Sequence, residues 1–172
     1  DAARRIVRLA DTYYKKGDTS VLPRSIASRH AMLNAMTLDI AMGGSTNTVL
    51  HLLAVAHEAG TDFRLDDIDA LSRRVPVLCK VAPNSAYHIE DVNRAGGIIS
   101  ILAELDRAGL VDTTALRADG LTLRQAIDRY SIGGQDYTAS ADELRRSAPG
   151  PKRSTELGRQ TAYYPSPDTD RT

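Results

Sequence analysis

An apolar helical pattern is broken at residues 43–47, which read Gly-Gly-Ser-Thr-Asn, and this break constrains the fold more than any other feature. Apolar residues recur at spacings of three and four over residues 28–42, with Ser28 placed to cap that helix. The same periodicity resumes over residues 45–59 and ends at Gly60. The pattern predicts two helices joined by a tight turn, with polar side chains gathered at the start of the second helix.

The start of a helix is also a place where anions bind. Unpaired backbone N–H groups and the positive end of the helix dipole attract a carboxylate or a phosphate, and hydroxyl and amide side chains add donors. The alternative is a plain turn in which Ser45 only caps the helix, and residue types alone favour that alternative. His51 follows Asn47 by one turn on the same face, so the two could bind one ligand. The candidate binding residues here are Ser45, Thr46, Asn47 and His51.

Periodicity predicts further helices in the rest of the chain. A double glycine at residues 96–97 marks either a break in the helix predicted over residues 89–108 or a close approach of two backbones. In the helix over residues 45–59, apolar residues occupy most of the circumference, which predicts that it is buried. The additional helices are predicted over residues 2–16, 65–72, 89–108 and 123–129.

Residues 75–81 form a short apolar run bounded by turn residues, and such a run predicts a buried, parallel strand. The predicted fold class is therefore α/β: a helix-rich piece of an α/β domain with at least one buried strand. Cys79 lies inside this run and is most simply a small core residue. As the only cysteine it excludes an internal disulfide, which fits a reducing, cytoplasmic location.

A second candidate binding residue, His88, stands where the predicted strand leads into the next helix. Loops between strands and helices often carry the functional groups of α/β proteins. The neighbouring Glu90 and Asp91 are more simply acidic residues of a helix's first turn, where the dipole favours them. For His88, a functional role and a structural one are equally compatible with the sequence.

The overall charge excludes some classes of function. Lys and Arg together number 22, and so do Asp and Glu, so no basic field indicates nucleic acid or an anionic membrane. No apolar run has the length of a membrane span. From residue 133 onward Gly, Ser, Pro and charged residues predominate, which predicts an extended arm over residues 133–172, with one short helix near residues 142–146.

Four blocks of the chain together resemble the family of dihydroxy-acid dehydratase and 6-phosphogluconate dehydratase, which also includes the aldonic acid dehydratases. The blocks are residues 21–27, residues 35–52 (which include Met-Gly-Gly-Ser-Thr-Asn-Thr-Val-Leu-His-Leu), residues 75–84 (Val-Pro-Val-Leu-Cys-Lys-Val-Ala-Pro-Asn) and residues 87–97 (Tyr-His-Ile-Glu-Asp-Val-Asn-Arg-Ala-Gly-Gly). Residues 48–50 and 87–91 are more similar to the dihydroxy-acid branch than to the phosphogluconate branch.

The resemblance implies that the chain is an internal piece of a longer hydro-lyase, with residues 1–132 in its N-terminal α/β domain and the arm leading toward a C-terminal domain. It implies an iron–sulfur cluster held by cysteines and a Mg²⁺ held by carboxylates and a modified lysine. The ligands of both metals, and the serine taken as the base, match no residue of this chain. Neither Cys79 nor Lys80 corresponds to a ligand in the family, so the piece alone is expected to be inactive.

The implied reaction is the loss of water from a 2,3-dihydroxy-carboxylate to give a 2-oxo acid, such as 3-methyl-2-oxobutanoate in valine and isoleucine biosynthesis. The expected partners are the small dihydroxy acid and a second copy in a homodimer. A dehydratase of aldonates or of 6-phosphogluconate, and a non-catalytic helical module that keeps only the fold, remain as alternatives. The residues expected to contact substrate, or to support those that do, are Ser45, Thr46, Asn47, His51 and His88.

Overall fold

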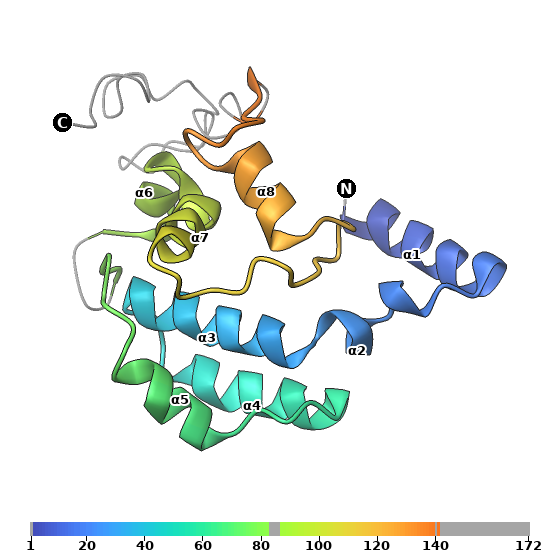
Figure 1. Ribbon diagram of the computed structural model, residues 1–172, viewed down its shortest axis with the longest axis horizontal. Coiled ribbons are helices and arrows are strands. Elements are labelled where there is room, and N and C mark those ends of the chain that lie inside the picture. Colours follow the sequence, from blue (N-terminus) through green and yellow to red (C-terminus); the bar gives the residue numbers. More distant parts are fainter. Residues whose placement is uncertain (1, 83–86, 140, 142–172) are drawn as a thin grey trace.

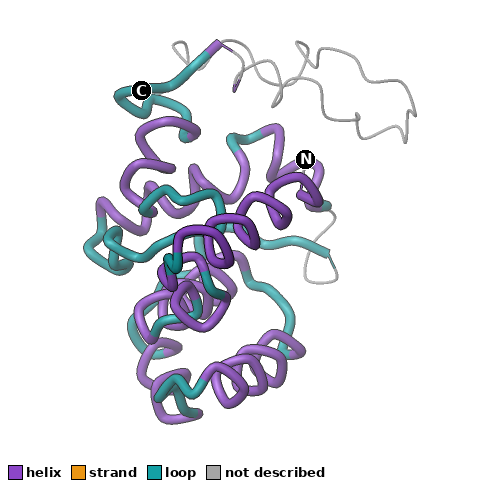
Figure 2. The backbone as a smooth tube through the Cα atoms, turned by 90° about the vertical axis from the view of Figure 1, so that its right-hand side faces the viewer, coloured by secondary structure: helices purple, strands orange, loops and turns teal. Residues whose placement is uncertain are grey.

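A computed structural model describes residues 2–82, 87–139 and 141 of the chain. This part of the chain consists of helices and loops, and Figure 2 shows no strand in it. The α-helices are α1 (Ala2–Lys16), α2 (Pro23–Ile26), α3 (Arg29–Met42), α4 (Asn47–Ala59), α5 (Leu65–Ser72), α6 (Ile89–Arg94), α7 (Gly97–Arg107) and α8 (Leu123–Tyr130), with a 3₁₀ helix η1 (Thr19–Val21) between α1 and α2.

Helix α3 is the centre of the arrangement. It packs against α4 and α5 on one side and against α7 on the other, and α7 in turn packs against α6 and α8 (Figure 1). Helix α1 extends to one side, contacts η1 and has no buried residue. Helix α3 therefore lies between α4 and α5 on one side and α7 on the other, and its end at residues 42–44 lies where chain segments of both groups can reach it.

The hydrophobic core follows from this layout. Buried apolar side chains come from α3, α5, α7 and α8 and include Ala56 of α4, while the other α4 side chains that pack against the core are only partly buried. At about 25 cal/mol per Å² of apolar surface removed from water, burial of this kind is the main force that holds such helices together. The largest contributors are Met32, Met36, Phe63, Ile68, Leu71, Leu102, Leu105, Leu123 and Ile127.

Local capping explains where the predicted helices begin and end. The Ser28 side chain accepts a hydrogen bond from the Ala31 amide at 3.3 Å, which starts α3 as predicted. Thr122 and Gln125 form a reciprocal capping box that starts α8. Gly60, with a φ of 70°, ends α4 in the left-handed conformation that favours glycine. The helices over residues 2–16, 28–42, 65–72 and 123–129 are confirmed to within a residue or so.

The predicted strand over residues 75–81 is wrong, and with it the α/β fold class for the described part of the chain. These residues adopt no regular secondary structure, and Val77 and Leu78 are about half exposed. Their backbone instead meets the end of α3, where the Leu78 and Cys79 amides both donate to the Ala41 carbonyl at 2.8 and 3.1 Å. An apolar run becomes a strand only when neighbouring strands pair with it, and the described residues provide none.

The predicted helix over residues 89–108 is two helices. The chain breaks at Gly96, where φ is 115°, and α7 begins at Gly97. The break is therefore confirmed, and what crowds Gly96 is side chains rather than a second backbone: a Cβ there would lie 2.5 Å from the Ser100 hydroxyl oxygen and 2.8 Å from Ile132 Cδ1. The glycine therefore serves both a backbone turn and a close contact.

Two other expectations change. Helix α4 is not buried on most sides, because its exposed flank carries Leu50 at 69% and Val55 at 48% of full exposure, while only Ala56 is fully buried. The predicted arm begins within the described residues at Gly133, but the helix predicted near residues 142–146 lies outside them.

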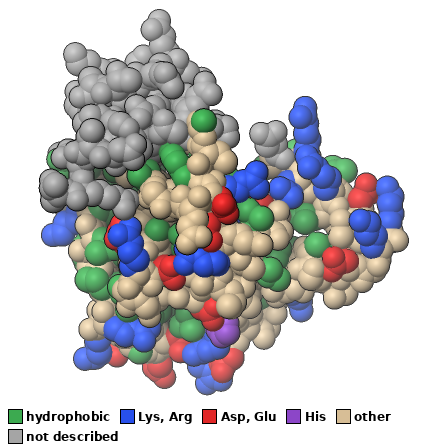
Figure 3. Space-filling view, turned by 45° about the horizontal axis from the view of Figure 1, so that its top comes forward, with side chains coloured by type: hydrophobic (Ala, Val, Ile, Leu, Met, Phe, Trp, Pro, Cys, Tyr) green, Lys and Arg blue, Asp and Glu red, His purple; other side chains and the backbone are tan. Residues whose placement is uncertain are grey.

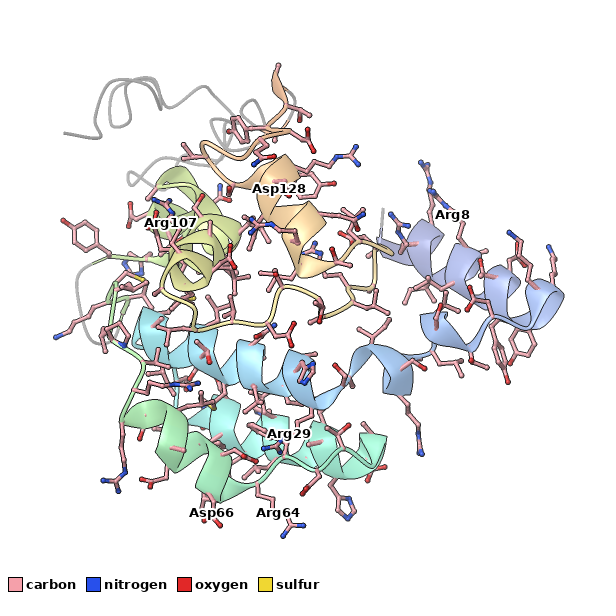
Figure 4. All side chains as sticks on the ribbon, viewed as in Figure 1. Arg8, Arg29, Arg64, Asp66, Arg107 and Asp128 are labelled. Atoms are coloured by element: carbon pink, nitrogen blue, oxygen red, sulfur yellow. The ribbon has the colours of Figure 1, made fainter. Side chains whose placement is uncertain are left out.

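An ion pair joins the two ends of the α3–α4–α5 unit. Arg29, at the start of α3, donates to both carboxylate oxygens of Asp67 in α5, at 2.5 and 3.1 Å, and also to the Asp62 carbonyl. Figure 4 places Arg29 on the side of α3 that faces α5. The guanidinium of Arg29 holds the pKa of the Asp67 carboxyl below its usual value. This clamp fixes the loop that follows α4.

Candidate functional site

The end of α3 and the start of α4 form a polar junction, defined here as residues 39–48. Gly43 takes a φ of 59° and ends α3, and its amide donates to the Ile40 carbonyl at 3.0 Å. The Gly44 amide donates to the Asp39 carbonyl at 2.9 Å, and the chain then turns directly into α4. The helix–turn–helix geometry expected from the two glycines is therefore present.

A second chain segment crosses this turn closely. A Cβ on Gly43 would lie 3.4 Å from the Cys79 carbonyl oxygen and 3.7 Å from both Val77 Cγ1 and Lys80 Cγ. Two amides of the same segment also bind the Ala41 carbonyl, one of the groups that a helix leaves unpaired at its C-terminus. The apolar segment after α5 thus closes the end of α3 and forms one wall of the polar junction.

Asp39 is a functional candidate that the sequence interpretation missed. One of its carboxylate oxygens accepts a hydrogen bond from the Thr48 hydroxyl at 2.8 Å, which ties the last turn of α3 to the first turn of α4. A signal was available, because a carboxylate near the C-terminus of a helix opposes the dipole and needs a partner elsewhere. Asp39 positions the start of α4, where the predicted binding residues lie.

The first turn of α4 offers side chains rather than free amides. The Asn47 amide donates to the Ser45 hydroxyl at 3.2 Å, and the Thr48 and Val49 amides donate to the carbonyls of Ser45 and Thr46 at 2.9 and 3.2 Å. These local bonds occupy the N–H groups that an anion at a helix N-terminus would use. The hydroxyl and amide side chains of Ser45, Thr46 and Asn47 are exposed to solvent and remain able to donate.

The two predicted histidines lie at the surface. His51 is exposed on α4, one turn after Asn47, as the helical spacing predicts. His88 is exposed at the start of α6, where its backbone amide donates to the Asp91 carboxylate at 2.9 Å. Within residues 2–82 and 87–139, no side-chain hydrogen bond or ion pair joins either histidine to residues 45–47. The structure therefore brings Ser45, Thr46 and Asn47 together but does not link the histidines to them.

The part of the chain that the structure describes does not fit the metal groups that the family resemblance implies. It contains no group of three or more His, Cys, Asp or Glu side chains placed to hold a metal ion. The only cysteine, Cys79, is partly buried, and its burial raises the pKa of the thiol, which disfavours the thiolate that binds metals. These residues therefore provide no iron–sulfur or Mg²⁺ site of their own.

The charged side chains on the surface are of mixed sign. In the face drawn in Figure 3, Lys and Arg side chains are interspersed with Asp and Glu, and no single sign of charge covers that face. Among the described helices, none combines the length and the apolar character needed to cross a bilayer.

Helices arranged around α3, with a polar turn at one end, are a framework compatible with many functions, and comparison with known families narrows them. The family model described as "Dihydroxy-acid/6-phosphogluconate dehydratase N-terminal" matches residues 1–126. The chain therefore belongs to the dihydroxy-acid/6-phosphogluconate dehydratase family, and its described helices are part of the N-terminal region of a hydro-lyase. The resemblance noted from the four sequence blocks is confirmed at the level of this family.

Proposed function

We propose that the chain is part of a hydro-lyase that converts 2,3-dihydroxy-carboxylates to 2-oxo acids, with 2,3-dihydroxy-3-methylbutanoate as its substrate. The observation that carries the proposal is the family match over residues 1–126. The choice of the dihydroxy-acid branch is supported by residues 48–50 and 87–91, which resemble that branch more than the phosphogluconate branch. A role in valine and isoleucine biosynthesis would follow from this substrate.

The reaction removes one proton from C2 and the hydroxyl group from C3, so that one water leaves. The enol that remains takes up a proton at C3 and loses the proton of its C2 hydroxyl, which gives the 2-oxo acid. Neither proton abstraction nor the departure of the hydroxyl is assigned to a described residue. The substrate's carboxylate needs hydrogen-bond donors, and we assign this binding role to the exposed side chains of Ser45, Thr46 and Asn47.

The geometry supports this role for two reasons. The three side chains lie on one turn and face solvent, and their backbone is held by local hydrogen bonds. Asp39 and Thr48 fix that turn against α3, so little conformational entropy is lost when a ligand binds. The segment that crosses Gly43 continues toward His88, which we propose as a further substrate contact or as support for one.

The substrate class is tested by assaying the purified full-length enzyme with 2,3-dihydroxy-3-methylbutanoate and with 6-phosphogluconate, and by measuring the 2-oxo acid formed. We expect kcat/KM to be higher for the first substrate by at least about a hundredfold, because a site built for one set of polar groups strongly disfavours another. Preference for 6-phosphogluconate would move the chain to the other branch of the family. Activity on neither substrate would favour the alternative of a non-catalytic module.

The binding role is tested by Asn47→Ala in the same enzyme. Loss of one hydrogen bond to a charged group should lower kcat/KM about tenfold or more. Asn93→Ala is a matched control, because Asn93 is likewise an exposed asparagine on a helix but lies outside the polar junction. Unchanged kcat/KM together with lower thermal stability in Asn47→Ala would contradict the assignment.

A further inference from the structure

A separate cavity of about 420 Å³ lies between α3, the end of α5 and the turn that follows α7. One face of α3 contributes His30, Asn34 and Thr37, which recur at spacings of four and three and therefore point the same way. None of the predicted substrate-binding residues lines this cavity. Its volume is within the range of pockets that hold small ligands.

Thr37 is the observation that points to a ligand. The residue lines the cavity, is only 1% exposed, and its hydroxyl has no hydrogen-bond partner in the part of the chain that the structure describes. Buried hydroxyl groups in native proteins nearly always have a partner, because an unpaired one costs free energy. A partner that enters through the cavity would satisfy it.

The other polar groups of the cavity, apart from Arg74, are already engaged. The Asn34 side chain exchanges two hydrogen bonds with the Asp112 backbone, at 2.7 and 2.8 Å. The Asp112 carboxylate pairs with His30 Nδ1 at 3.0 Å and accepts two hydrogen bonds from Thr114. The anionic group of the cavity is therefore satisfied without a ligand.

Arg74 is the remaining charged group. Arg74 is among the residues that line the cavity and forms no ion pair with any described residue, whereas the neighbouring Arg73 pairs with Asp69 at 3.0 Å. The rest of the wall is apolar, so a ligand must present both a negative charge and a hydrocarbon surface. The apolar wall consists of Leu33, Leu71, Leu110 and Val111.

We propose that this cavity binds a small carboxylate that carries a hydroxyl or oxo group next to the carboxylate and a short aliphatic body. Arg74 forms a two-pronged ion pair with the carboxylate, as guanidinium groups commonly do. Thr37 bonds the neighbouring hydroxyl or oxo oxygen, and the aliphatic body packs against the apolar wall. The site is distinct from the polar junction, so this proposal stands whether or not the reaction proposed above is correct.

The test is a calorimetric titration of the full 172-residue chain, with 2-hydroxy-3-methylbutanoate as the probe. Two compounds serve as ligand controls: 3-methylbutane-1,2-diol lacks the charge, and inorganic phosphate lacks the aliphatic body. Arg74→Gln should raise Kd about ten- to a hundredfold, the effect of losing a hydrogen-bonded charge. Arg73→Gln is the matched control. It removes the same charge from the neighbouring residue, whose side chain does not line the cavity.

Thr37→Val and Thr37→Ser form a second pair of variants. Thr37→Val keeps the shape of the side chain but removes the hydroxyl, so it should raise Kd several-fold. Thr37→Ser keeps the hydroxyl, so its Kd should stay close to that of the unchanged protein. Saturable binding of the probe that depends on Arg74 and on the Thr37 hydroxyl supports the site. Absence of saturable binding, equal losses in Arg73→Gln and Arg74→Gln, or equally tight binding of the diol or of phosphate would each overturn the proposal.

Discussion

Gly44→Ala tests whether the polar junction depends on close packing rather than on glycine flexibility. Gly44 does not have a positive φ, so alanine can adopt its backbone conformation without strain. An added Cβ would nevertheless lie 2.3 Å from Asp39 Oδ1, 2.8 Å from its Cγ and 3.1 Å from its carbonyl oxygen. The carboxylate of Asp39 must therefore move away from Thr48, and the backbone must shift slightly as well.

The expected cost is the sum of three contributions. Loss of the hydrogen bond between Asp39 and Thr48 costs about 1.5 kcal/mol, the low end for a bond to a charged group, because the pair is only partly buried. Crowding against the Asp39 backbone adds about 1–2 kcal/mol. Replacing glycine by alanine returns about 0.5 kcal/mol by restricting the unfolded chain. The free energy of unfolding should therefore fall by about 2–3 kcal/mol, which lowers Tm by roughly 5–10 °C.

A double-mutant cycle with Asp39→Ala separates the steric mechanism from a general weakening. Asp39→Ala removes the side-chain atoms that clash and the hydrogen bond but leaves the Asp39 carbonyl, so the further cost of Gly44→Ala in that background should fall by about 1.5 kcal/mol, to about 0.5–1.5 kcal/mol. Gly60→Ala is the control, because Gly60 has a φ of 70° and no neighbouring atom within 4 Å of an added Cβ. Its cost of about 1 kcal/mol arises from backbone conformation alone and should be the same in both backgrounds.

Urea denaturation followed by circular dichroism measures all of these free energies. The interpretation is refuted if Gly44→Ala is neutral, or if its cost is the same with and without the Asp39 side chain. Equal coupling of Asp39→Ala to Gly60→Ala would also refute it, since Gly60 lies at the opposite end of α4.

Three further predictions concern other parts of the fold. Gly96→Ala should lower the free energy of unfolding by about 3 kcal/mol, because the added Cβ combines a φ of 115° with a contact of 2.5 Å to a serine hydroxyl. Gly109→Ala, where φ is 66° and the space is open, should lower it by only about 1 kcal/mol in the same urea titration. The pKa of the Asp67 carboxyl is lower in the folded than in the unfolded state, so its pairing with Arg29 stabilises the protein above about pH 4. This stabilisation is lost as pH falls through the folded-state pKa. Asp67→Asn should therefore lower Tm at pH 7 but not near pH 2. Thr37→Val removes a buried, unpaired hydroxyl and should leave Tm unchanged or raise it when no ligand is present; a clear fall in Tm would show that the hydroxyl has a partner in the free protein.

The accuracy of the sequence predictions follows the range of the interactions involved. Ser28, Thr122 and Gly60 act on backbone groups within a few residues, so the limits of their helices are readable from the sequence. A strand depends on partners that are distant in the chain, so the apolar run over residues 75–81 could not show by itself whether other strands pair with it. That run instead satisfies the end of α3, a contact for which no sequence pattern is known.

The candidate site shows the same division. The shared face of Asn47 and His51 is a local property of α4 and was predictable from helical spacing. The part played by Asp39 was not, because its hydrogen bond to Thr48 exists only after the chain has turned at Gly44. A carboxylate near the end of a helix was the available sign, and it indicates only that a partner exists, not which one.

The polar junction also depends on a segment far along the chain. The Ala41 carbonyl at the end of α3 is satisfied by two amides from residues 78–79, and the turn at Gly43 fits beneath the same segment. That segment continues to Ala82, whose amide donates to the Tyr87 carbonyl at 2.7 Å, directly before His88. The end of α3 and the turn at Gly43 are thus held by contacts between residues that are far apart in sequence.

This dependence explains why residue types alone could not decide between a plain cap and a binding site at Ser45. A plain turn needs only local bonds, and the one that the Ser45 hydroxyl accepts from the Asn47 amide is present, although the residue that caps α4 is Thr46, whose side chain forms no capping bond. A binding site also needs the turn to be held in one orientation against the rest of the protein, and here Asp39 and residues 78–79 supply that support. The same turn has both the local bond and the support, so the local bond of Ser45 does not count against the proposed role in binding.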